Sequence, residues 1–97
     1  MIQIHDIFVC KPGNASKLAK LCKEAMTADK HVRHIMTDMT GQFNRVIIVS
    51  EYENLTDYEK SWEEMMNPTP EMKEAMKKME GYQDMYLTGG REIYKVW

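Results

Sequence analysis

Residues 2–26 read IQIHDIFVCKPGNASKLAKLCKEAM, and this stretch sets the pattern from which the rest of the chain is interpreted. Its first part, 2–10, combines β-branched and aromatic residues and is closed by Pro12-Gly13, which predicts a strand followed by a turn. From Asn14, a favourable helix N-cap residue, apolar residues recur at spacings of three and four, as they do on one face of a helix. This stripe consists of Leu18, Leu21, Cys22, Ala25 and Met26.

The remainder of the chain continues the alternation of strand and helix patterns. Residues 32–39 and 43–52 indicate two strands joined by 40–42, a Thr-Gly-Gln link short enough for an antiparallel hairpin. A second helix is expected after Asn54, and a third begins at Thr69, beyond the break that Asn67-Pro68 imposes. Residues 82–97 read as a last strand, with a bulge or bend at Gly89-Gly90. The predicted order is βαββαβ.

This order predicts one α+β domain over residues 1–97, of the ferredoxin-like class with an antiparallel sheet. Right-handed crossovers place both helical connections on the same face of the sheet, so the other face has no cover within the chain. Alternating residues such as His5, Ile7 and Val9, or their neighbours of opposite parity, would leave an apolar patch there, larger than monomers usually expose. Two copies packed sheet to sheet would cover it through a symmetric interface. We therefore expect a homodimer.

Composition excludes several classes of function. A net charge of −2 gives no field that would gather nucleic acid. No apolar run approaches the roughly 20 residues that span a bilayer, so membrane insertion is not expected. The first residues lack the pattern of a signal peptide, and two cysteines are too few for a disulfide scaffold. These features favour a soluble, cytoplasmic protein.

Two stretches resemble a known group of proteins. FVCKPGNASKLAKL (8–21) resembles the first strand, Lys-Pro-Gly turn and helix of dimeric α/β-barrel proteins, and GQFNRVIIVSEYENLTDYE (41–59) resembles the NIPSNAP-like branch of that superfamily. The resemblance implies a ferredoxin-like fold that pairs into a dimeric barrel. The superfamily includes cofactor-free and haem-degrading monooxygenases, isomerases, polyketide cyclases and proteins of unknown activity, so the fold does not specify the function.

Asp6 is the most informative single residue, because it interrupts an apolar strand face between Ile4 and Phe8. A carboxylate buried there would be costly unless it were paired. One interpretation is a catalytic acid or base facing a pocket between sheet and helices, where the resembled families carry asparagine or arginine. The alternative is a structural ion pair with an arginine: Arg33, Arg45 or Arg91.

The strongest apolar cluster lies on the second helix around Trp62, next to the break in the helical region. Such a break could leave a gap through which a ligand enters, although a plain aromatic core is an equal alternative. The predicted ligand-binding residues are Ile4, Asp6, Phe8, Tyr52, Tyr58, Trp62, Met65, Met66 and Tyr86. The thioether walls would suit a flexible apolar ligand, and two tyrosines could orient its polar head.

Other candidate chemistry is weaker. His5 is interpreted as a hydrogen-bonded group facing the subunit interface, and His31 and His34 have no further ligand at zinc-binding spacing. The methionine stripe of Met72, Met76 and Met79 is interpreted as a core-facing helix face rather than a copper site. The second half of the chain has no histidine to ligate haem. No metal and no cofactor is predicted.

The leading hypothesis is a dimeric protein that binds a fatty-acyl-like or polyketide-like molecule between sheet and helices, with Asp6 serving any cofactor-independent chemistry. A non-catalytic dimerisation or scaffold protein is the alternative. A monooxygenase of the haem-degrading or antibiotic-biosynthesis type is a further alternative, implied by the resemblance.

Overall fold

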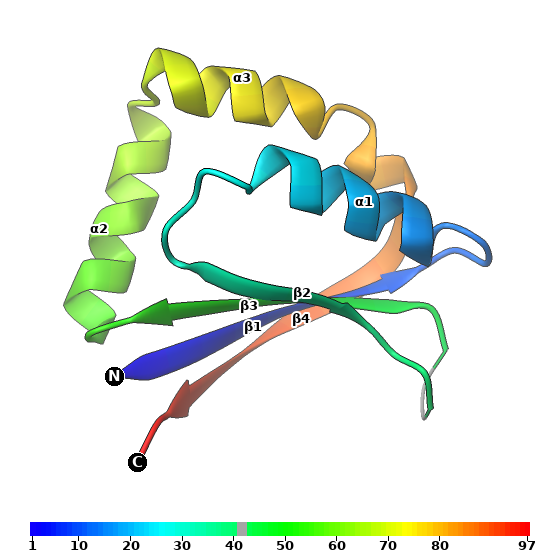
Figure 1. Cartoon of the computed structure of the whole chain (residues 1–97), viewed down its shortest axis with the longest axis horizontal. Coiled ribbons are helices and arrows are strands. Elements are labelled where there is room, and N and C mark those ends of the chain that lie inside the picture. Colours follow the sequence, from blue (N-terminus) through cyan, green and yellow to red (C-terminus); the bar gives the residue numbers. More distant parts are fainter. Residues whose placement is uncertain (41–42) are drawn as a thin grey trace.

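The computed structural model describes residues 1–40 and 43–97 and follows the predicted order of elements (Figure 1). Each strand or helix predicted from the sequence pattern is present, and a 3₁₀ turn, η1, precedes the last strand. The elements are β1 (Ile2–Cys10), α1 (Ala15–Ala25), β2 (Val32–Thr37), β3 (Arg45–Tyr52), α2 (Leu55–Met66), α3 (Pro70–Lys78), η1 (Tyr82–Asp84) and β4 (Tyr86–Lys95).

The four strands form one antiparallel sheet in the order β2-β3-β1-β4. This is the ferredoxin-like arrangement that the βαββαβ order predicts, with β1 and β3 in the centre. In this register Asp6 of β1 lies between Ile48 of β3 and Arg91 of β4. The register thus brings together residues 85 positions apart in the chain.

All helices lie on one face of the sheet (Figure 1). Alternation along the strands sends one set of side chains toward them, and these residues form the core together with α1. The buried core cluster consists of Cys10, Leu18, Cys22, Val46 and Ile48. Both cysteines are free thiols buried in this core, where a thiol packs as a small apolar residue.

The second helical region is less deeply packed than α1. Its two helices begin at side-chain caps, since Asn54 accepts a hydrogen bond from the Asp57 amide at 2.9 Å and Thr69 accepts one from the Met72 amide at 3.2 Å. Neither α2 nor α3 has a fully buried residue, whereas α1 buries two. Figure 1 shows α3 above α1 and α2 standing at one end of the sheet.

Among the described residues, no helix covers the opposite face of the sheet (Figure 1). One half of this open face is apolar, with Ile7 and Ile47 side by side at its centre and Met36 beside them on β2. The other half is polar: Gln3 Nε2 donates to Glu51, which also pairs with Arg33 at 2.9 Å. The predicted division of the sheet into a covered face and an uncovered face is confirmed.

Two local predictions need correction. Gly89 and Gly90 pair in regular register with Phe8 and Ile7, and the irregularity lies instead opposite the Val9/Cys10 step, where Leu87 is the extra residue. The predicted bulge position was therefore wrong. β2 and β3 are also shorter than predicted, ending at residue 37 and beginning at 45, and the centre of the predicted hairpin turn, 41–42, lies outside the described residues.

Candidate functional site

The carboxylate of Asp6 faces the helices and forms an ion pair with Arg91 on the neighbouring strand. Arg91 Nε donates to Asp6 Oδ1 at 2.5 Å, and the two side chains are 42% and 27% exposed. The other two arginines considered as partners are engaged elsewhere, Arg33 with Glu51 and Arg45 with Asp38. Partial exposure and pairing with a guanidinium let Asp6 carry its charge at this position.

Arg91 connects the sheet to α2. Its guanidinium carbon lies 4.8 Å from the centroid of the Trp62 ring, a cation–π arrangement. The hydrogen bond with Asp6 is the main cause that raises the pKa of Arg91 above its usual range. Arg91 is therefore a permanent cation held from two sides, by a carboxylate on β1 and by an indole on α2.

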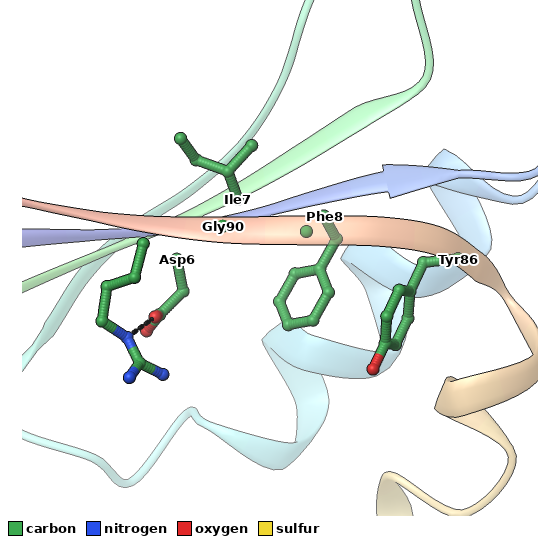
Figure 2. Close-up of a pocket in the computed structure, with 7 residues that line it drawn as sticks. Asp6, Ile7, Phe8, Tyr86 and Gly90 are labelled. Carbon is green, nitrogen blue, oxygen red and sulfur yellow. Dashed lines mark hydrogen bonds and ion pairs between the residues drawn. The ribbon is translucent and has the colours of Figure 1, made fainter.

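A surface hollow of about 380 Å³ adjoins this ion pair. Its lining residues are Asp6, Ile7, Phe8, Tyr86, Gly89, Gly90 and Arg91. Figure 2 shows the side chains of Asp6, Phe8 and Tyr86 on one side of the sheet, with Ile7 pointing to the other. The side chain of Ile7 thus belongs to the open face. The hollow combines two aromatic walls with one ion pair, a mixture typical of small-molecule sites.

Gly89 determines the floor of the hollow. A Cβ atom built at this position would lie 2.7 Å from the carbonyl oxygen of Ile7, which is closer than real side chains come. At Gly90 a Cβ would meet nothing within 4 Å. The first glycine is therefore required by a close approach between β4 and β1, which leaves the strand backbone open to the hollow.

Aromatic rings extend from Arg91 along α2 to the start of β2. Successive ring centroids lie 6.1 Å apart for Trp62 and Tyr58, 5.3 Å for Tyr58 and Tyr52, and 4.1 Å for Tyr52 and His31. On the other side of the hollow, Phe8 and Tyr86 are in edge contact at 5.0 Å. We call the first group, His31, Tyr52, Tyr58 and Trp62, the aromatic row.

The two inner tyrosines of the aromatic row differ in the state of their hydroxyl groups. Burial raises the pKa of Tyr52, and its hydroxyl is near Ser61. The Tyr58 oxygen is buried and has no hydrogen-bond partner among the described residues. Buried polar atoms are normally paired, so Tyr58 is the exception in this part of the molecule.

The structure does not gather the predicted ligand-binding residues into one site: three of them line the hollow, and three others lie in the aromatic row, outside its lining. Asp6, Phe8 and Tyr86 line the hollow, and Tyr52, Tyr58 and Trp62 belong to the aromatic row. Ile4 is fully enclosed in the interior. Met65 and Met66, at the end of α2, are 47% and 82% exposed.

Four lining residues were absent from the sequence-based list of ligand contacts: Ile7, Gly89, Gly90 and Arg91. Arg91 was considered only as an ion-pair partner, and Gly89 and Gly90 only as a bend. The register of β4 on β1 is what places them beside Asp6, because the strand pairing cannot be read from either strand alone. The one signal in the sequence that could have indicated the ion pair was the presence of a charged residue in each of two strands, Asp6 in β1 and Arg91 in β4.

Metal and membrane features were also assessed. Within residues 1–40 and 43–97, no three His, Cys, Asp or Glu side chains are grouped so as to hold a metal ion. None of the helices in the described part of the chain has the length and apolarity needed to cross a bilayer.

Comparison with known proteins gives no match by sequence but clear matches by structure. No family profile matches the chain, and no curated protein has a significantly similar sequence. An uncharacterized NIPSNAP-like domain protein from Burkholderia xenovorans superimposes with a TM-score of 0.77 at 18% identity, covering 99% of this chain and 84% of that one. A NIPSNAP family protein of unknown function from Agrobacterium tumefaciens gives 0.75 at 14% identity, covering 99% and 87%.

A second group of structures is similar at a lower level. A proposed antibiotic biosynthesis monooxygenase from Deinococcus radiodurans has a TM-score of 0.59 at 13% identity, with 100% of this chain and 93% of that chain covered. At such identities the likeness establishes the fold alone. The ferredoxin-like fold and the structural likeness to NIPSNAP-like proteins, both predicted from the sequence, are confirmed.

Proposed function

We propose that this chain binds an elongated apolar small molecule, of the fatty-acyl or polyketide-like class, in the hollow beside Asp6 and Arg91. The observation that carries the proposal is the lining itself, in which Phe8 and Tyr86, in edge contact with each other, form an apolar wall beside exposed strand backbone. The volume of about 380 Å³ lies in the range of small-molecule pockets, toward its lower end. Aromatic walls bind apolar chains by burying apolar surface area, and the ion pair at one end orients a polar head group.

Asp6 is the proposed group for proton transfer. Its Oδ1 accepts the hydrogen bond from Arg91, while Oδ2 has no hydrogen-bond partner among the described residues. The second oxygen is therefore free to accept a proton from a bound molecule, with the cationic Arg91 stabilising the negative charge that develops on that molecule. This chemistry needs no cofactor.

Ligand binding is tested with Trp62 as the reporter. Trp97 is fully exposed, so a Trp97→Phe background leaves the indole next to Arg91 as the source of the signal. We expect C12 ligands to change its fluorescence, and native mass spectrometry to show bound ligand. Tyr86→Ala should weaken binding by about tenfold because it removes one aromatic wall.

The matched control is Thr88→Ala, which shortens a side chain on the same strand but on the open face. It should bind like the wild type. Asp6→Asn should bind and lose any turnover. A protein that gives no fluorescence change and no bound mass with any C12 probe would refute the proposal.

The alternative, a dimerisation or scaffold protein, is favoured by a separate observation on the shape of the chain. Its accessible surface is 7133 Å², whereas a compact monomer of 11.4 kDa exposes about 5,800 Å². The excess of about 1,300 Å² matches what each partner buries in a stable homodimer. We propose that the open face pairs with a second copy, an arrangement compatible with ligand binding on the other face.

A further inference from the structure

The ion pair of Asp6 and Arg91 gives the hollow a formal charge of zero. Of the described residues that line the hollow, these two are the only ones with charged side chains. They lie side by side, because Asp6 on β1 and Arg91 on β4 are partners in the register of the two strands. A head group that enters the hollow therefore meets one anion and one cation together, not a single charge.

The ion pair retains hydrogen-bonding capacity of both kinds. A guanidinium has five N–H donors, and the bond to Asp6 Oδ1 uses the one on Arg91 Nε. Trp62 contacts the guanidinium through its ring face, whereas the N–H groups lie in the plane of the guanidinium, so the cation–π contact does not occupy them. Both side chains line the hollow and are partly exposed. The pair thus offers the hollow a donor and an acceptor side by side.

Charge and hydrogen bonding together determine which head group fits. A carboxylate could pair with Arg91 but would lie next to the carboxylate of Asp6, and an ammonium group would meet Arg91 in the same way. Like charges at such distances repel, more strongly where water is partly excluded. A neutral group that only accepts would cover Asp6 without giving it a hydrogen bond in place of water, which is costly. A neutral group with both a donor and an acceptor satisfies both partners.

We propose that Asp6 and Arg91 select a neutral head group that carries a hydrogen-bond donor next to an acceptor, of which a primary carboxamide is the simplest. The inference rests on the proposed function and adds to it the class of head group and the residues that select it. The head group donates to Oδ2 of Asp6 and accepts from an Nη atom of Arg91. The apolar chain then lies against Phe8 and Tyr86, which are in edge contact in the same hollow.

The test compares four probes that share one C12 chain: dodecanamide, N,N-dimethyldodecanamide, dodecanoate and dodecylammonium. Each is titrated at neutral pH, below the concentration at which it forms micelles, with Trp62 fluorescence in the Trp97→Phe background as the readout. The protein with both charges in place should bind dodecanamide at least about tenfold more tightly than each other probe. The dimethyl amide isolates the donor, because it keeps the acceptor and has no N–H.

Two charge variants should change the preferred probe in opposite directions. Asp6→Asn leaves the cation without its counter-charge, so dodecanoate should bind more tightly than dodecanamide. Arg91→Gln leaves the carboxylate alone, so dodecylammonium should bind best. Either shift tests the inference if the other variant folds poorly. The control is Glu92→Gln, which removes a negative charge beside Arg91 in the chain but on the open face, opposite His5. It should keep the wild-type order of affinities.

The outcomes separate this inference from the proposed function. If another probe binds the wild type as tightly as dodecanamide, the ligand site stands and the head-group assignment is overturned. The same holds if neither Asp6→Asn nor Arg91→Gln changes the order of affinities. If none of the four probes binds the wild type, the ligand site itself is wrong, and the assignment of its head group falls with it.

Discussion

The thiol of Cys22 illustrates how a single buried residue links the core to pH. It lies on the inner face of α1 and is fully enclosed. Burial raises the pKa of Cys22 to about 11, and the neighbouring Cys10 thiol adds to the effect. A thiol that stays protonated is a poor nucleophile. Cys22 should therefore be inert toward thiol reagents while the protein is folded.

This burial predicts a loss of stability at alkaline pH. The pKa of Cys22 is higher in the folded than in the unfolded chain. The protonated thiol therefore contributes fully to the free energy of unfolding below about pH 9, and this contribution declines as the pH rises toward about 11. Ellman's reagent should label neither cysteine at pH 8 without denaturant. The free energy of unfolding, measured in urea between pH 8 and 11, should decline less steeply with pH for Cys22→Ala than for the wild type. The variant should also be less stable at every pH by about 1 kcal/mol, because the buried sulfur is lost. Parallel declines, or rapid labelling of the native protein, would contradict this account.

At the same scale, the sequence could identify Asp6 but not what it does. A carboxylate in an apolar strand face is visible from alternation alone, and its pairing with an arginine was one of two interpretations. The identity of that arginine depends on the register between β1 and β4, which local pattern does not encode. The unpaired hydroxyl of Tyr58 is likewise invisible in the sequence, because it depends on how α2 packs.

Among the elements, β4 makes the clearest mutational prediction. Gly89→Ala would place a methyl group against the Ile7 carbonyl, whereas the same change at Gly90 meets open space. We expect Gly89→Ala to lower the free energy of unfolding by about 1–3 kcal/mol through local overpacking. Gly90→Ala should be neutral, or stabilise by up to about 1 kcal/mol because it restricts the unfolded chain. The midpoints of urea unfolding provide the comparison, and equal effects of the two changes would argue against the close approach.

The elements themselves were largely predictable because their signals are local. Apolar spacing, the caps at Asn54 and Thr69, and Pro70 in the first turn identify the helices before any tertiary contact forms. The bulge was misplaced for the opposite reason. Paired glycines suggest a bend, but Gly89 is present because a second strand passes close to it, while the extra residue is Leu87. Contacts between strands, not local preference, decide both positions.

At the scale of the whole molecule, a single chain is broad and thin. Its principal extents are 35, 35 and 19 Å, and its radius of gyration is 13.6 Å, compared with about 12.5 Å for a compact domain of this length. The two faces of the sheet account for this shape. Helices cover the face that carries the ion pair of Asp6 and Arg91, and the open face presents Ile7 and Ile47. The proposed dimer would turn two thin layers into one compact particle.

The dimer proposal is tested at the centre of the open face. Ile7→Lys introduces one charge per subunit into an interface that meets its own copy, so the assembled pair would bury two unpaired cations. We expect the wild type to sediment at twice 11.4 kDa and the variant to dissociate at least about a hundredfold more readily, with its far-UV circular dichroism unchanged. Met66→Lys is the control, because it adds the same charge at an exposed methionine on the helical side. A monomeric wild type would contradict the dimer, and the excess surface would then belong to the free chain. A dimer that only Met66→Lys disrupts would place the interface elsewhere than on the open face.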